Sequence, residues 1–332
     1  MNKLLALTVL LLSLTSPALK SQEFPKAEIS NRSIRASLYL PDPKKGYYRA
    51  TRFDWAGVIA SLECNGHNYF GVWFPKYDPK LHDSITGPVE EFQTGETGLG
   101  YDQAKPGGTF IRIGVGVLRK PDEPRFQRFK TYEIVDTGKW TVRPHADSVE
   151  FSQELSDPAT GYAYFYQKTV GLAKDAPQMT IEHSLRNTGK RPIETNVYNH
   201  NFFVIDGQPS GPEFSVRFPF ELKATADLLN LAEIRGKELT YLRELEGGGQ
   251  SVFTELAGYG TSSRDFDIRV ENRKVGAGVR VTGDQPLWKV IFWSIRTVLS
   301  PEAYVNMVIQ PGSEFRWKLT WDFYSLAGSG CE

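Results

Sequence analysis

His200 is the residue in this sequence whose type and neighbours best suit proton chemistry. It stands in the segment YNHNFF, from Tyr198 to Phe203, within a run typical of a β-strand. Because side chains alternate between the two faces of a strand, His200 shares a face with Tyr198 and Phe202. An aromatic wall with a polar group is typical of a sugar pocket, where rings stack on the apolar face of the sugar. The same pattern also fits a histidine that serves only as a hydrogen-bonded part of the core.

Two other histidines receive different interpretations. His82 lies in the segment DPKLHDSITGP, and we expect this loop to lie over a sheet face and bring His82 to a ligand. The alternative is a solvated loop with Asp-capped turns. The spacing of His82 from Asp78 and Asp83 matches no specific ligand pattern, so no metal is expected. His183 shares its strand face with three apolar residues, which predicts a core histidine.

The elements that position these residues are predicted to be β-strands. From about Ser33 onward, short apolar runs are separated by turns rich in Gly, Pro and Asn. Residues 148–155 and 162–172 flank one such turn, while residues 303–310 and 315–326 flank another and are expected to close a sheet. This spacing predicts a single all-β domain, built as a large antiparallel β-sandwich or barrel.

Two segments are less regular. Residues 226–247 mix helical spacing with an internal glycine, which fits either a short helix or an irregular excursion. Residues 110–120, FIRIGVGVLRK, alternate like one continuous strand, with Gly114 and Gly116 on one face. Glycines on a strand face allow a ligand or a packed aromatic ring to approach the backbone. The glycines near this segment follow no phosphate-loop or dinucleotide pattern, and no cofactor is expected.

The charge of the chain is balanced, with 39 Lys and Arg against 39 Asp and Glu in 332 residues. This balance gives no reason to expect nucleic acid or an anionic membrane as a partner, and it fits a neutral ligand. Aromatic residues make up 13% of the chain, which favours strands and flat binding surfaces.

The N-terminal segment predicts export. Residues 1–21 have a lysine, the apolar run Leu4–Leu14 and then small residues, a pattern typical of a secretory signal peptide. The run is too short for a comfortable membrane span. We therefore expect a mature domain of residues 22–332, periplasmic or secreted, that is not bound to a membrane after cleavage. Cys64 and Cys331 are the two cysteines, and whether they pair is left open.

The segment around His200 resembles one in the galactose mutarotases, the aldose 1-epimerase family. LRNTGKRPIETNVYNHNFF has that family's Asn-Thr-Gly, proline turn and Asn-His-x-(Tyr/Phe)-Phe, and Asn199 to Phe203 match position by position. FDWAGVIASLECNGHNY and SPEAYVNMVIQPGSEFRWKLTWDFY are similar to the family's opening and closing strands. The resemblance implies a mutarotase-like β-supersandwich. It also implies a monosaccharide or oligosaccharide ligand on the concave face of the large sheet.

The resemblance further implies a reaction. Mutarotation opens a hemiacetal by removing the proton of the anomeric hydroxyl and protonating the ring oxygen, and the ring then closes as the other anomer. This requires a base and an acid on opposite sides of the sugar. Imidazole, with an ordinary pKa of about 6.5, suits the acid. By the resemblance, His200 is the catalytic acid, with Asn199 and Tyr198 contacting the substrate.

The sequence departs from the family at its other functional positions. Arg296, in SIRT, stands where the family has its glutamate base, and an arginine stays protonated and cannot act as a base. The family's arginine-bearing and histidine-bearing stretches are replaced by GPVEEF and GLGY. Glu302 is the first candidate for a substitute base, and a loop carboxylate paired with Arg296 is its alternative interpretation. Glu90 and Glu91 point to opposite faces of a strand, so one of them is expected to face the pocket.

Three functions fit these observations. An exported aldose 1-epimerase-like isomerase requires a carboxylate across the pocket from His200. A sugar-binding protein without catalysis does not. A polysaccharide lyase or hydrolase, in which Arg296 neutralises a uronate, predicts an extended groove with aromatic residues in line. Trp73, Trp293 and Tyr101 are the candidates for that line. The fold alone does not choose among these functions.

Overall fold

The computed structural model describes residues 23–326, which form four antiparallel sheets and two short 3-10 helices, η1 (Ile205–Gly207) and η2 (Ser263–Asp265). The largest sheet has ten strands, in the order β16 (Ala232–Arg235), β17 (Glu238–Tyr241), β14 (Phe214–Arg217), β19 (Asp267–Asn272), β20 (Ala277–Gly283), β23 (Glu314–Ser325), β12 (Gln178–Asn187), β11 (Tyr162–Leu172), β10 (Ser148–Asp157) and β9 (Lys139–Pro144).

The other three sheets are smaller. A six-stranded sheet has the order β15 (Lys223–Ala224), β18 (Val252–Ala257), β21 (Lys289–Ile295), β22 (Val298–Ile309), β13 (Ile193–His200) and β5 (Val89–Gln93). A four-stranded sheet contains β1 (Lys26–Ser30), β2 (Ile34–Tyr39), β3 (Val58–Cys64) and β4 (His67–Phe70). A three-stranded sheet contains β6 (Thr109–Arg112), β7 (Gly116–Arg119) and β8 (Ile134–Asp136). This architecture confirms the predicted all-β sandwich.

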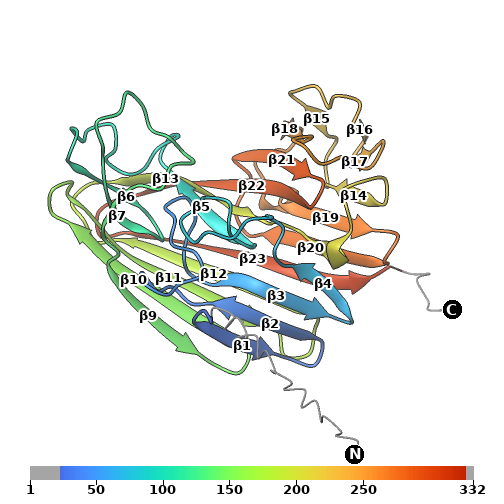
Figure 1. Ribbon diagram of the computed structural model, residues 1–332, viewed down its shortest axis with the longest axis horizontal. Coiled ribbons are helices and arrows are strands. Elements are labelled where there is room, and N and C mark those ends of the chain that lie inside the picture. The colour runs from blue at the N-terminus through green and yellow to red at the C-terminus, as the bar shows by residue number, and fades with distance from the viewer. Residues whose placement is uncertain (1–22, 327–332) are drawn as a thin grey trace, which may run out of the picture.

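The pattern of burial explains how the sheets are layered. In β10 and β23, buried and more exposed positions alternate, because one face packs on the core and the other faces solvent. In contrast, β5 is buried at every position, so both of its faces are covered. Figure 1 shows β13, β22 and β21 above the curved ten-stranded sheet, with the segments around β6 and β7 rising at one end and those around β15 and β18 at the other.

Two irregular segments differ from their predicted forms. Residues 226–247 are neither a helix nor an irregular excursion, because they contain the antiparallel hairpin of β16 and β17, with Gly236 at a φ of 61° in its turn. Residues 110–120 are not one strand, because the chain reverses at Gly114, where φ is 78°, and β6 pairs with β7. A left-handed conformation of this kind is open to glycine without steric cost, and it breaks the apparent alternation.

The predicted closing pair of strands is also divided. β22 and β23 follow each other in sequence but belong to the six-stranded and ten-stranded sheets, so the turn between them crosses from one sheet to the other. Cys64 is a buried free thiol within the described residues, while Cys331 lies outside them. Among residues 23–326, no helix has the length and apolar character needed to cross a membrane.

Candidate functional site

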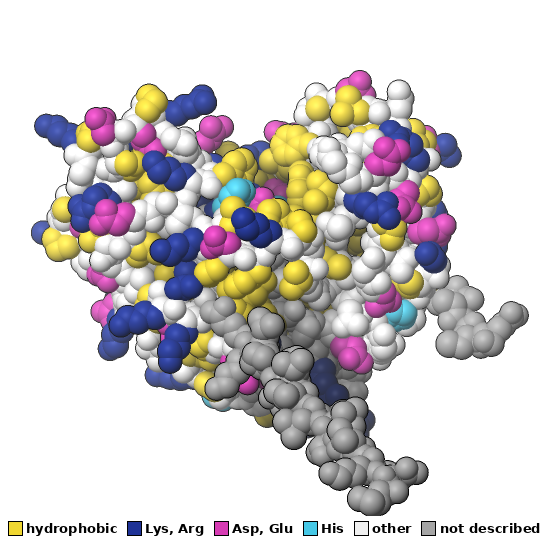
Figure 2. Space-filling view, viewed as in Figure 1, with side chains coloured by type: hydrophobic (Ala, Val, Ile, Leu, Met, Phe, Trp, Pro, Cys, Tyr) yellow, Lys and Arg dark blue, Asp and Glu magenta, His cyan; other side chains and the backbone are white. Residues whose placement is uncertain are grey.

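A cavity of about 260 Å³ lies on the side of the six-stranded sheet that faces away from the ten-stranded sheet. Both aromatic rings and polar side chains line it. The rings belong to Phe129, Phe202, Phe253, Trp293 and Tyr304, and the polar side chains to Arg52, Asp83, Arg128, His200 and Glu302. Figure 2 shows a hollow between the two raised parts of the molecule, with hydrophobic side chains gathered along its flank.

His200 is held against the wall of this cavity by aromatic rings. Its imidazole stacks on Phe202, with 3.5 Å between the ring centroids, and meets the edge of Trp293 at 5.2 Å. β13 ends at His200, and Phe202 has a φ of 45°, in the left-handed region that is unfavourable for a bulky residue. This bend folds the Phe202 ring flat onto the imidazole, whereas regular strand geometry separates residues two apart by about 7 Å.

The protonation of His200 follows from its burial. Desolvation, followed by the charges of Arg52 and Arg128, holds the pKa of His200 well below its ordinary value, although Glu91 acts in the opposite direction. The imidazole is therefore neutral at neutral pH. Its Nδ1 atom is buried and has no hydrogen-bond partner among residues 23–326. Its Nε2 atom lies 3.2 Å from Oε1 of Glu302.

Glu302 is buried on β22 and faces His200. Desolvation raises the pKa of Glu302 to about 7, and the hydroxyl of Tyr304 donates to its Oε2 atom at 3.2 Å. The alternative pairing with Arg296 is wrong. Arg296 lies in the turn between β21 and β22, where it binds the carboxylate of Glu244 and the carbonyl oxygen of Leu245. Arg296 is half exposed and does not line the cavity.

Glu91 organises the cationic side of the site. Its carboxylate accepts from Arg52 at 2.9 Å, Arg112 at 3.1 Å, Arg128 at 2.7 and 3.0 Å, and the hydroxyl of Tyr198 at 2.6 Å. The three guanidinium groups hold the pKa of Glu91 well below its ordinary value, although burial opposes them. Glu91 is thus a permanent anion whose oxygens are occupied, which makes it a positioning residue for Arg52 and Arg128 rather than a base.

Glu90 points to the opposite face of β5, as the strand alternation predicts. It accepts from Asn199 at 2.9 Å, contacts His183 at 2.8 Å and is ion-paired with Lys168, all between the two large sheets. Neither Glu90 nor Asn199 lines the cavity, so the expectation that they contact a ligand there is not met. Glu91 and Tyr198 do not line it either, and they act on the site only through Arg52 and Arg128. His183 is buried and stacks on Trp317, which confirms its interpretation as a core histidine.

The remaining predicted residues lie at different distances from the site. Trp293 lines the cavity directly. His82 lies at its rim, with Nε2 3.1 Å from Asp83 and its ring 4.8 Å from that of Phe129. Tyr101 lines a neighbouring cavity of about 830 Å³. Trp73 is buried in the core of the smaller sheets, so it is not part of an exposed row of aromatic residues.

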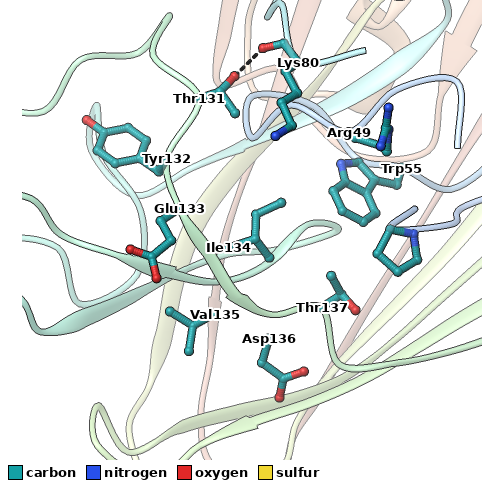
Figure 3. Close-up of a pocket in the computed structure, with 11 residues that line it drawn as sticks. Arg49, Trp55, Lys80, Thr131, Tyr132, Glu133, Ile134, Val135, Asp136 and Thr137 are labelled. Carbon is teal, nitrogen blue, oxygen red and sulfur yellow. Dashed lines mark hydrogen bonds between the residues drawn. The ribbon is translucent and has the colours of Figure 1, made fainter. Parts of the chain in front are cut away.

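A separate hollow of about 530 Å³ is lined by Trp55, Lys80 and residues 131–137 (Figure 3). In Figure 3, the hydroxyl of Thr131 donates to the main-chain oxygen of Lys80, at 2.5 Å. None of the residues predicted for the site lines this hollow, and it shares no lining residue with the His200 cavity. Within residues 23–326, no group of three or more His, Cys, Asp or Glu side chains could hold a metal ion.

Sequence comparison finds no relative, since no family model and no curated protein matches the chain. Solved structures do match. A galactose mutarotase-like protein from Clostridium acetobutylicum is 13% identical, with a TM-score of 0.55 over 90% of this chain and 95% of that one. An aldose epimerase homologue from C. elegans is 15% identical, with a TM-score of 0.51 over 91% of this chain and 99% of that one.

A third similar structure, a putative aldose 1-epimerase from Escherichia coli K12, is 13% identical, with a TM-score of 0.52 over 91% of this chain and 99% of that one. Identities this low carry information about the fold alone. The structural agreement extends over nine-tenths of the chain. It confirms the mutarotase-like fold that the sequence around His200 indicates. The chain therefore has the galactose mutarotase-like fold, in a divergent form.

Proposed function

We propose that the His200 cavity binds a sugar. The observation that carries this proposal is a fixed set of hydrogen-bonding groups beside aromatic rings. Glu91 holds Arg52 and Arg128 in place, and Phe202 holds His200. Rings can stack on the apolar face of a sugar while a few immobile polar groups select its hydroxyls, and immobile groups lose little entropy on binding. The galactose mutarotase-like fold supports the same class of ligand.

Anomer interconversion at the same site is a second candidate function, and the pKa of Glu302 favours it. A carboxyl group with a pKa of about 7 can both accept and donate a proton at neutral pH. In this reaction the anomeric hydroxyl loses a proton, the ring oxygen gains one, and the bond between C1 and the ring oxygen breaks. Rotation and reclosure then give the other anomer.

The contact between His200 and Glu302 limits how that reaction can proceed. Their side chains are 3.2 Å apart, so a sugar ring cannot lie between them. The arrangement in which an acid and a base act from opposite sides of the sugar is therefore not open to this pair. Both proton transfers have to occur on one side of the ring, through Glu302 and the neutral imidazole. The contact between His200 and Glu302 therefore favours sugar binding over anomer interconversion as the function of the site.

The test combines binding with polarimetry. A glycan array and titration calorimetry would identify ligands of the wild type, His200→Asn and the control His145→Asn, since His145 is half exposed and remote from the cavity lining. We expect saturable binding that weakens at least tenfold in His200→Asn only. Faster interconversion of fresh α-glucose or α-galactose, lost in His200→Asn, would establish catalysis. Absence of wild-type binding across the array would contradict the proposal.

We also propose that the protein is exported, with residues 1–21 removed. The support is the pattern of the N-terminal segment, which lies outside the described residues. Expression of the full chain in a bacterium, followed by mass spectrometry of the periplasmic fraction, should give an N-terminus close to residue 22. An intact N-terminus confined to the cytoplasm would contradict export.

A further inference from the structure

The His200 cavity adjoins a larger cavity. The two have four lining residues in common, Arg128, Phe253, Ile291 and Tyr304. Their volumes differ, at about 260 Å³ around His200 and about 830 Å³ for the neighbour. The shared residues place the two cavities side by side, and we call the two together the groove, with its smaller part at His200.

One strand forms the floor of this groove along its length. Lys289, Ile291 and Trp293 are alternate residues of β21 and therefore share a face. Lys289 lines the larger cavity, Ile291 lines both, and Trp293 lines the smaller one. At about 3.3 Å per residue, this row extends over about 13 Å. The row therefore runs along both cavities and extends beyond the space that a single sugar ring at His200 would occupy.

Two large aromatic side chains are exposed on this groove. The exposed fraction of Phe253 is 58% and that of Trp288 is 48%. Phe253 lies opposite Trp293 on the neighbouring strand, and the ammonium group of Lys289 lies 5.3 Å from the Trp288 ring centre. Exposed aromatic rings gathered along a groove, rather than scattered singly, mark a binding surface. Their flat faces suit the apolar faces of sugar rings.

The charges of the larger cavity narrow the class of ligand. Besides Arg128, its lining has three cations and three carboxylates, namely Lys120, Arg125, Lys289, Glu96, Asp102 and Glu123. This balance provides hydrogen-bond donors and acceptors for hydroxyl groups without a strong field of one sign. A neutral, hydroxyl-rich chain fits such a lining better than a polyanion.

We propose that the larger cavity is a second subsite, in which sugar units joined to the one at His200 stack on Phe253 and Trp288. The ligand is accordingly a neutral oligosaccharide rather than a free monosaccharide. This inference rests on the proposed sugar binding at His200. Of the aromatic residues predicted to lie in line, Trp293 and Tyr101 line the groove and Trp73 does not, while Phe253 and Trp288 add two exposed rings to it.

Titration calorimetry with a series of increasing length tests the second subsite. The series is the monosaccharide, disaccharide and tetrasaccharide of the neutral glycan that binds best on the array. We expect the tetrasaccharide to bind at least tenfold more tightly than the monosaccharide. Trp288→Ala should reduce this difference severalfold and leave monosaccharide affinity within about twofold, because Trp288 lines only the larger cavity. Phe253 lines both cavities, so Phe253→Ala should weaken the binding of the monosaccharide and of the tetrasaccharide. Val308→Ala, an exposed apolar residue outside both linings, is the control.

The outcomes separate this inference from the function on which it rests. Equal affinity for all three lengths would overturn the second subsite while leaving sugar binding at His200 in place. Tighter tetrasaccharide binding that Trp288→Ala and Phe253→Ala do not change would also overturn it, since the extra units would then bind elsewhere. Binding of no neutral glycan by the wild type would overturn the oligosaccharide ligand. Melting temperatures of the variants within a few degrees of the wild type exclude loss of the fold.

Discussion

At the residue scale, His200 and Glu302 are a buried pair, and burial decides the charge of each side chain. Burial lowers the pKa of His200 and raises that of Glu302 to about 7, so both side chains favour their neutral forms. A salt bridge between them is therefore not the principal state at neutral pH. Such a pair costs stability and offers exchangeable protons at a cavity wall, which is a pattern common at functional sites.

Replacing Glu302 by glutamine should stabilise the protein in a pH-dependent way. The folded-state pKa of Glu302 is raised from 4.5 to about 7, so above pH 4.5 the unfolded chain loses the proton more readily. This lowers the wild-type free energy of unfolding by about 3 kcal/mol above pH 7 and by nothing below pH 4.5. We therefore expect the free energy of unfolding of Glu302→Gln, relative to that of the wild type, to rise by this amount between pH 4.5 and pH 7. We also expect this variant to bind sugar more weakly.

Urea unfolding from about pH 4 to about pH 8 measures this effect. Glu194→Gln, at an exposed position of β13, is the control and should follow the wild type at every pH. A constant difference between Glu302→Gln and the wild type across this range would show that the pKa of Glu302 is not raised.

Glu91 has the opposite role, because it stabilises the site at neutral pH. Glu91→Gln leaves Arg52, Arg112 and Arg128 together around a neutral amide. Breaking a buried ion pair by removing one partner typically costs roughly 3 to 5 kcal/mol. We expect a loss of this size in urea unfolding at pH 7, whereas Glu194→Gln should stay within about 0.5 kcal/mol of the wild type. A loss below about 1 kcal/mol would contradict the role assigned to Glu91.

At the element scale, the turn between β6 and β7 packs closely against the side chain of Asp54. A Cβ atom added at Gly114 would lie 2.6 Å from Oδ1 of Asp54, and Gly114 also has a φ of 78°. Asp54 accepts from the main-chain nitrogen of Ala56 and from the hydroxyl of Tyr166. The glycine therefore allows a buried carboxylate to pack directly against the turn.

Gly114→Ala should be more damaging than the same change at Gly107. Both residues have a positive φ, at 78° and 83°, but nothing lies within 4 Å of a Cβ atom at Gly107. The left-handed conformation costs roughly 1 to 2 kcal/mol in each case. The contact with Asp54 should add about 1 to 3 kcal/mol at Gly114 only, as overpacking does. Thermal and urea unfolding of the two variants would measure the difference, and equal losses would contradict the close approach.

At the scale of the whole molecule, the two large sheets are built from interleaved parts of the chain. From β13 to β23 the chain passes repeatedly between the six-stranded and ten-stranded sheets. Buried ionic groups also join the sheets, since Lys168 of β11 and His183 of β12 contact Glu90 of β5. Neither sheet is a continuous segment that could keep its structure if the other were lost.

A chain of residues 22–332 should therefore unfold in one cooperative transition. Circular dichroism follows the strands, and fluorescence follows the seven tryptophans, which include Trp55 and Trp321 in the two different core clusters. We expect the two signals to coincide in urea. Two separated transitions would show instead that the chain contains more than one folding unit.

Much of the fold and part of the candidate site follow from local patterns. Strand alternation is a property of neighbouring residues, so the sequence alone determined that Tyr198 and His200 share a face and that Glu90 and Glu91 do not. Phe202 lies beyond the end of β13 and reaches His200 through its left-handed bend, which alternation does not predict. The same alternation predicted the paired strands β10 and β11 and the all-β class. It failed at residues 110–120, because the positive φ of Gly114 reverses the chain without changing the alternation of residue types.

Only the tertiary structure decided what surrounds His200. The guanidinium groups of Arg52 and Arg128 reach the hydroxyl of Tyr198 from 146 and 70 residues away in the chain. Glu302 turns toward His200 rather than Arg296 because of the way β22 packs beside β13. Contacts between distant segments depend on how sheets pack and which groups are desolvated together, and local sequence patterns carry little information about either. The sequence by itself thus determined the strand face on which the site lies, and the packing of the sheets decided its chemistry.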